Sequence, residues 1–96
     1  MTEFDFVAVG LTILDTLGRP ISRLPDPGAV ELIEEIRMTA AGTAAGPAVI
    51  AAKLGLRTRL VGAIAQDAMG RVLRDALVAD GVDVGTYVAY LDVRGR

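Results

Sequence analysis

The chain has 96 residues, with ten basic and twelve acidic side chains and a formal net charge of −2. Hydrophobic residues make up 52% of it and charged residues 23%, so it is not a disordered chain and can bury a core. It contains no cysteine and no histidine. This excludes disulfide frameworks, Cys/His zinc sites and catalytic triads that need histidine.

The charges are spread along the chain and neither sign forms a block. Because no aromatic platform lies between the scattered arginines, we expect no nucleic-acid partner. Glu3 and Asp5 stand where a signal peptide would carry positive charge. The longest uncharged stretch, Met38 to Ala52, is shorter than the ~18 residues that span a bilayer. We therefore expect a soluble, cytoplasmic protein with no membrane partner.

The first predicted element is a strand over Phe6–Val9, a continuous apolar run that ends at Gly10. Such a run is typical of a parallel strand covered on both faces. Residues 11–14 continue it loosely and end at Asp15. The glycines and prolines between Gly18 and Gly28 then predict a connection rich in turns.

The segment that follows fits two structures. Apolar residues at positions 29, 32, 33 and 36 have helical spacing, and Asp26 could cap such a helix. Val30 and Leu32, and then Ile36 and Met38, instead alternate as in a strand, with a change of face between the pairs. The pattern alone leaves both interpretations open.

The second half of the chain predicts alternating helices and strands. A helix over Ala44–Leu54 ends at Gly55, and a strand covers Arg59–Ala65. Asp67 caps a second helix that runs to about Asp80 and ends at Gly81, and a last strand covers Tyr87–Val93. On the second helix we expect an apolar face that includes Met69 to lie in the core. The order of elements predicts an α/β architecture.

Two places are candidate binding sites. The small residues of Gly42–Pro47 open a helix, where free N–H groups and a close backbone approach suit a ligand. The alternative is a tight loop that feeds a closely packed helix. The P-loop and Gly-x-Gly-x-x-Gly patterns are absent and no basic residue is adjacent, so a phosphate or nucleotide site is the weakest interpretation.

Asp15 is the second candidate, because it follows the first strand at the edge of a parallel sheet where ligands gather. Its carboxylate can accept hydrogen bonds from two neighbouring hydroxyl groups, as a polyol presents them. The alternative is a loop aspartate that caps a turn before Gly18. Asp67 is explained as a helix cap.

The order of these motifs resembles the opening of the PfkB (ribokinase-like) carbohydrate kinases. The resemblance rests on Gly10 with Asp15, on the small-residue run from Gly42, and on three later motifs: Ala48-x-x-Ala51-Ala52-x-Leu54-Gly55, Val61-Gly62-x-x-x-x-Asp67-x-x-Gly70 and Leu77-x-x-x-Gly81-Val82-Asp83. It implies that residues 1–96 are the N-terminal part of a ribokinase-like three-layer fold. The small β lid would cover about residues 12–40, with Val30–Met38 as a lid strand rather than a helix, and the C-terminal nucleotide-binding part would be absent.

The same resemblance implies ATP-dependent phosphorylation of a hydroxymethyl group on a sugar or nucleoside. Asp15 would hold substrate hydroxyls, and Gly42, Thr43 and Gly46 would form the loop beside the sugar. The family usually has asparagine in place of Gly46, and some members have a polar residue in place of Ile13, which leaves the identity of the sugar open.

The family's catalytic base, anion hole and ATP site belong to later segments that these residues do not contain. We therefore expect ATP and Mg²⁺ to serve the full-length enzyme, no cofactor or metal to bind this segment alone, and the segment to be inactive alone. Because residues 92–96 look like the start of a turn, we also expect a truncated chain. The alternative is a non-catalytic α/β half-module that forms a homodimer through its lid strands or sheet edge.

Overall fold

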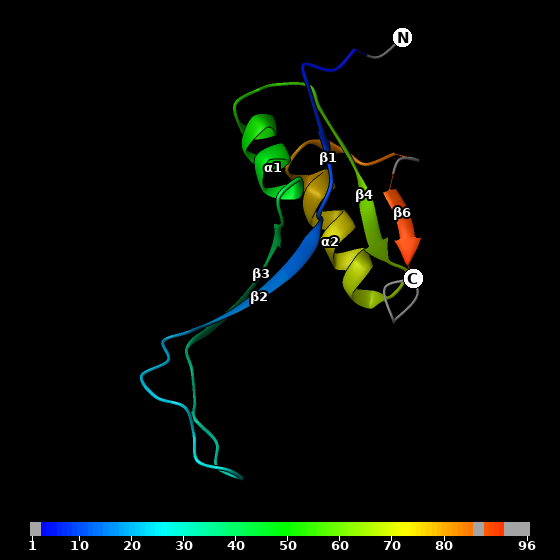
Figure 1. The fold of residues 1–96 in the computed structure, drawn as a ribbon. Helices are drawn as coiled ribbons and strands as arrows, with labels where there is room; N and C mark the ends of the chain where they lie inside the picture. Colours follow the sequence, from blue (N-terminus) through cyan, green and yellow to red (C-terminus); the bar gives the residue numbers. More distant parts are fainter. Residues whose placement is uncertain (1–2, 86–87, 92–96) are drawn as a thin grey trace.

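The computed structural model describes residues 3–85 and 88–91. Within these residues, two helices and six strands follow one another in a mixed α/β order (Figure 1). In chain order the elements are β1 (Phe6–Val9), β2 (Ile13–Arg19), β3 (Glu35–Ala41), α1 (Ala45–Lys53), β4 (Thr58–Ala65), α2 (Ala68–Ala79), β5 (Val82–Asp83) and β6 (Val88–Leu91). The predicted α/β class is confirmed.

The main sheet is parallel and has β4 at its centre. β1 and β5 pair with β4, and β6 pairs with the end of β4 that β5 does not reach. Register places Ala8 opposite Leu60, and both are buried with Ala48 of α1 and Leu77 of α2 in one core cluster. Both helices therefore pack on the same face of the sheet.

The other face of the sheet is uncovered at β1. Val7 and Val9 alternate with the buried Ala8, and 74% of Val9 is exposed. The expectation that this strand is covered on both faces is wrong for the described residues, because α1 and α2 both lie on the opposite face. β1 is thus an apolar strand with one face in the core and one open.

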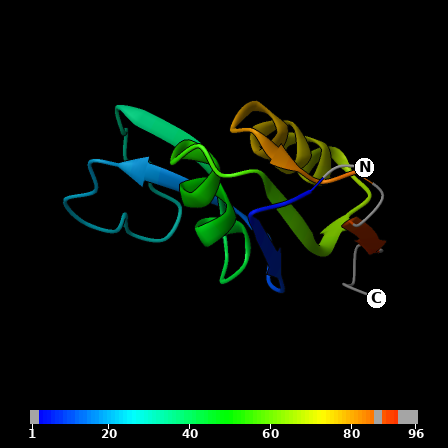
Figure 2. The ribbon, with the colours of Figure 1, turned by 90° about the horizontal axis from the view of Figure 1, so that it is seen from above.

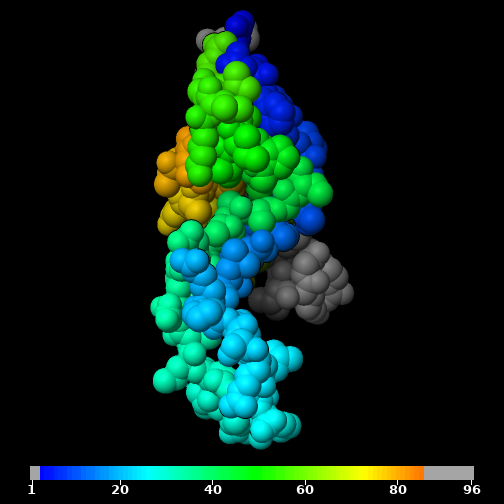
Figure 3. Space-filling view, turned by 90° about the vertical axis from the view of Figure 1, so that its left-hand side faces the viewer, coloured from blue at the N-terminus to red at the C-terminus, as the bar shows by residue number. Residues whose placement is uncertain are grey.

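A second, two-stranded sheet projects from this layer. β2 and β3 pair antiparallel from Ile13 opposite Ala41 to Arg19 opposite Glu35. Seen from above, this hairpin extends to one side of the layer that contains β1, β4 and the helices (Figure 2). The long loop of residues 20–34 lies at its far end in the space-filling view (Figure 3).

The hairpin corrects three expectations. Residues 11–14 do not extend the first strand, because β1 ends at Val9 and β2 starts at Ile13. The turn-rich connection was expected from Gly18, but Gly18 lies within β2. The helix over residues 29–36 does not form, because β3 takes its hydrogen-bond partners from β2, and the strand starts at Glu35 rather than Val30.

The start of α2 and the C-terminal ends of both helices agree with the sequence pattern. The Asp67 carboxylate accepts a hydrogen bond from the N–H of Gly70 at 2.9 Å and so caps α2. Gly55 and Gly81 follow the two helices with φ of +89° and +87°, a backbone conformation that glycine adopts without strain. The predicted strands over 59–65 and 87–93 are present as β4 and β6, while residues 87, 92 and 93 lie outside the described residues.

The apolar face of α2 is not buried along its whole length. Leu73 and Leu77 are buried as expected, but 56% of Met69 is exposed. Met69 lies in the first turn of α2, where the helix begins beside a pocket rather than over the centre of the sheet. Within the described ranges, no helix combines the length and apolar character needed to cross a bilayer.

Candidate functional site

Asp15 lies on the β2–β3 hairpin and not directly after β1. It is the third residue of β2, it is half-buried, and its partner across the hairpin is Thr39. Because side chains alternate along a strand, Asp15 shares one face of the hairpin with Ile13 and Leu17. A carboxylate and a hydroxyl thus stand side by side on this face, and both bind alcohols.

The predicted loop residues form one tight turn between β3 and α1. The N–H of Gly46 donates to the carbonyl oxygen of Gly42 at 2.9 Å. Gly42 has φ of +107°, and a Cβ on it would stand 2.5 Å from the carbonyl oxygen of Leu11. The exposed Thr43 lies near Gly10, since a Cβ on Gly10 would be 3.9 Å from the Thr43 Oγ1. The close approach of the Leu11 backbone therefore explains why a glycine is needed at position 42.

The start of α1 is not an open anion site. The N–H groups of Ala44 and Ala45 both donate to the carbonyl oxygen of Leu11, at 3.0 Å and 3.3 Å. These are donors that a helix N-terminus would otherwise offer to a phosphate. The finding weighs against the interpretation of Gly42–Pro47 as a phosphate or nucleotide site.

Gly46 has room for a side chain. A Cβ built on it meets no heavy atom within 4 Å. Its position in the first turn of α1 also tolerates ordinary residues. The glycine in place of the family's usual asparagine is therefore not required by local packing.

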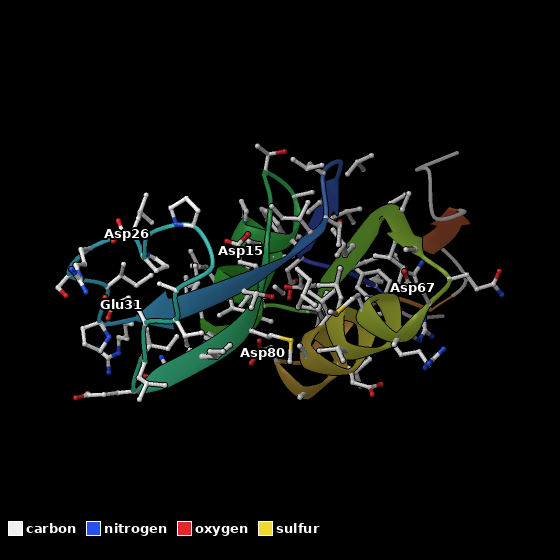
Figure 4. All side chains as sticks on the ribbon, turned by 90° about the horizontal axis from the view of Figure 1, so that it is seen from below. Asp15, Asp26, Glu31, Asp67 and Asp80 are labelled. Atoms are coloured by element: carbon white, nitrogen blue, oxygen red, sulfur yellow. The ribbon has the colours of Figure 1, made fainter. Side chains whose placement is uncertain are left out.

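The hairpin register brings the four predicted residues to the end of the hairpin that adjoins the main layer. Asp15 lies two residues beyond Ile13, whose partner Ala41 immediately precedes Gly42. Asp67 is separate from this group, because it caps α2 while Asp15 lies on the hairpin (Figure 4). Asp15, Gly42, Thr43 and Gly46 are thus neighbours along one strand pair and the turn that follows it.

A pocket adjoins this group without including any of its members. It has a volume of about 430 Å³ and lies between the segment 10–14, the end of β4 and the first turns of α2. Ile13, Ile64, Met69 and Leu73 contribute to its lining. Sequence analysis missed this pocket, although the motif Val61-Gly62 offered a signal. A Cβ on Gly62 would stand 2.8 Å from the carbonyl oxygen of Gly10, so Gly62 allows the 10–12 segment to cross β4.

A smaller pocket of about 200 Å³ lies further out on the hairpin. Its lining includes Arg19, Glu35 and Arg37. The Glu35 carboxylate pairs with both arginines, with Arg37 Nη2 at 2.6 Å from its Oε1. Both guanidinium groups are exposed, and one carboxylate neutralises part of their charge.

The described residues do not form a fitting nucleotide–magnesium site. Within 3–85 and 88–91, no three side chains of His, Cys, Asp or Glu gather closely enough to hold a metal ion. The amides at the start of α1 are engaged by Leu11. We therefore derive no chemical step through ATP or Mg²⁺ from these residues.

Comparisons with known proteins agree with the fold. Residues 4–92 match the pfkB family carbohydrate kinase. A nucleoside kinase from Methanothermobacter thermautotrophicus is 33% identical over 88 residues, which are 92% of this chain and 28% of that protein. The chain therefore belongs to the PfkB family of carbohydrate kinases.

Solved structures show the same architecture. Arabidopsis thaliana ribokinase, in a complex with ribose and ATP, is 30% identical and matches with a TM-score of 0.77 over 96% of this chain and 30% of its own. A ribokinase-like structure from Agrobacterium tumefaciens is 27% identical and also has a TM-score of 0.77, over 92% of this chain and 28% of its own. The ribokinase-like fold class is confirmed, and the chain spans less than a third of the length of these relatives.

Proposed function

We propose that this chain supplies the substrate-binding part and lid of an ATP-dependent kinase that phosphorylates a hydroxymethyl group of a sugar or nucleoside. Asp15 accepts hydrogen bonds from substrate hydroxyls. Gly42, Thr43 and Gly46 form the loop beside the substrate, and the β2–β3 hairpin is the lid. Residues 1–96 act as the N-terminal segment of a kinase domain in the cytoplasm.

The observation that carries the proposal is the position of Asp15. Its carboxylate stands beside the Thr39 hydroxyl on one face of a projecting hairpin, at the end nearest the turn of Gly42–Gly46. A face with adjacent acceptor and hydroxyl groups suits a ligand with several hydroxyls. The family membership supplies the reaction class, phosphoryl transfer to an alcohol.

Phosphoryl transfer needs more than this face. It depends on positioning the acceptor hydroxyl and on stabilising charge on the transferred phosphoryl group. In our proposal the base, the anion-binding groups and the ATP and Mg²⁺ sites belong to the part of the kinase fold that this chain does not span. The segment binds substrate and does not turn it over alone.

A second candidate function is association with another copy through the hairpin. Ile36 and Met38 share the hairpin face opposite Asp15, and 67% of Ile36 is exposed. Exposed apolar side chains on a two-stranded sheet favour pairing with another surface. A homodimer formed through the lid strands would cover this face and leave Asp15 accessible, so it is compatible with the kinase proposal.

Calorimetric titration of the chain with ribose tests the proposal. We expect binding that Asp15→Asn weakens by about tenfold, because a neutral amide replaces a charged acceptor of two hydrogen bonds. Asp75→Asn, on the exposed surface of α2, is the matched control and should bind as the parent does. Equal affinity for the parent and Asp15→Asn would remove Asp15 from the site.

A further inference from the structure

The pocket of about 430 Å³ beside the hairpin is unsuited to the hydroxyl groups of a free sugar. Among its lining residues the one polar side chain is Thr12, which is buried and donates to the carbonyl oxygen of Gly10 at 3.3 Å. Thr12 Oγ1 can still accept one hydrogen bond, but the remaining hydroxyls of a buried sugar would meet no polar side chain of the lining, which is unfavourable. The lining favours an apolar group.

Strand β2 connects the pocket to Asp15. Ile13 lines the pocket and shares its face of β2 with Asp15, two residues away. Two residues of a strand span about 7 Å. A ligand held by its hydroxyls at Asp15 can therefore place an adjoining group against Ile13.

The apolar side of the pocket suits a flat ring. Ile13 and Met69 are both partly exposed, so their side chains are available to a ligand. The flexible thioether side chain of Met69 adapts to ring faces and edges. The volume lies in the range of pockets that hold small organic ligands.

We infer that the pocket receives the base of a nucleoside whose ribose hydroxyls are held by Asp15, so that the substrate class is nucleosides rather than free sugars. The inference rests on the proposed function and restricts its substrate class from sugars and nucleosides to nucleosides. Ile13 and Met69 are then the residues that set specificity for the base. The competing place for an extended substrate is the smaller pocket past Leu17, where Arg19 and Arg37 would favour an anionic group.

Strand β2 offers a matched pair of variants. Ile13 and Leu17 flank Asp15 at equal spacing on the same face, with 38% and 53% of each exposed. Ile13→Asn changes the proposed base pocket, whereas Leu17→Asn makes the same chemical change on the other side of Asp15. Met69→Gln, on the exposed first turn of α2, changes the same pocket without touching β2.

Titration of the 96-residue chain with ribose, uridine and inosine, followed by NMR, tests the inference. Of uridine and inosine, we expect the one with the higher affinity to bind about tenfold more tightly than ribose does. The reason is that its base buries apolar surface. Ile13→Asn and Met69→Gln should each remove most of this advantage, and Met69→Gln, which lies off β2, should leave ribose binding unchanged. Leu17→Asn should retain it.

The outcomes separate the inference from the proposed function. If Asp15→Asn weakens ribose and nucleosides alike, but nucleosides bind no tighter than ribose, the inference is overturned and the proposed function stands. Loss of the nucleoside advantage in Leu17→Asn, with Ile13→Asn and Met69→Gln unaffected, also overturns the inference. If no ligand binds, or Asp15→Asn changes nothing, both are overturned.

Discussion

Gly42 lies directly against the backbone of Leu11, so that a Cβ at position 42 would stand 2.5 Å from the Leu11 carbonyl oxygen and 2.9 Å from its carbonyl carbon. The same carbonyl oxygen accepts the N–H groups that open α1. One carbonyl therefore connects three parts of the chain: the β1–β2 connection, the end of the hairpin and the first helix. The position of Asp15 depends on this junction, since β2 begins and β3 ends beside it.

Substitution of Gly42 by alanine should disrupt this junction. The added methyl group contacts backbone atoms that cannot move as a flexible side chain does, and φ of +107° is strained for alanine. We expect the free energy of unfolding to fall by about 2–3 kcal/mol. Urea denaturation followed by circular dichroism measures this change.

Gly46→Ala is the matched control for Gly42→Ala. The two glycines belong to one turn, but a Cβ on Gly46 has no heavy atom within 4 Å. Alanine is also favoured over glycine in a helix by up to about 1 kcal/mol. We expect Gly46→Ala to leave stability unchanged or to raise it. Equal destabilisation by the two variants would contradict the structural role of Gly42.

Asp67→Ala should weaken the start of α2. The variant loses the carboxylate that accepts from the Gly70 N–H, which typically costs about 1 kcal/mol. Asp75→Ala removes the same charge from an exposed position of the same helix and should change stability by less than about 0.5 kcal/mol. Thermal unfolding of both variants measures the difference, and similar melting temperatures would argue against the cap.

The Asp5–Arg57 pair should make stability depend on pH in acid. Hydrogen bonds from the Arg57 side chain and backbone lower the pKa of Asp5 from its ordinary value of 3.8 to about 2. The folded state therefore binds this proton less readily than the unfolded state does. The stabilising effect is complete above the unfolded pKa and is lost as pH falls through the folded pKa.

Comparison with Asp5→Asn isolates this effect. The parent should be more stable than the variant above about pH 4, and the difference should shrink between pH 4 and pH 2. Urea denaturation at several pH values in this range measures it. A difference that stays constant with pH would mean that the Asp5 carboxylate has no special interaction in the folded state.

The isolated chain should not transfer phosphate. With ATP, Mg²⁺ and ribose or a nucleoside present, we expect no ADP release above the rate without the acceptor, because the proposed substrate face lacks a base and anion-binding groups of its own. A coupled ADP-release assay measures the rate. Acceptor-dependent ADP release would show that catalysis does not require the missing parts of the fold.

The main sheet and helices were predictable because their signals are local. Asp67 with Gly70 marks the start of α2, and Gly55 and Gly81 mark the ends of the helices. Continuous apolar runs also mark β1 and β4. In these cases the residues that decide the structure are the residues of the element itself.

The hairpin and the pocket depend on pairing between distant segments. The apolar residues at 29, 32, 33 and 36 have helical spacing, but pairing with β2 sets where β3 begins. Met69 has an apolar side chain in an amphipathic helix, yet it lies beside a pocket because α2 begins where the 10–14 segment crosses β4. Neither relation can be obtained from local spacing, because both depend on which distant segment is adjacent.

The most direct test of the account is a map of the backbone amides that respond to ribose. In ¹⁵N-labelled chain we expect the NMR signals of Asp15, Thr39 and the turn of Gly42–Gly46 to shift as ribose is added, because the proposed substrate lies on this face. Asp15→Asn should reduce these shifts strongly at a ribose concentration that does not saturate the parent. Shifts confined to α2 and β5, or the same shifts in the parent and in Asp15→Asn, would contradict the account.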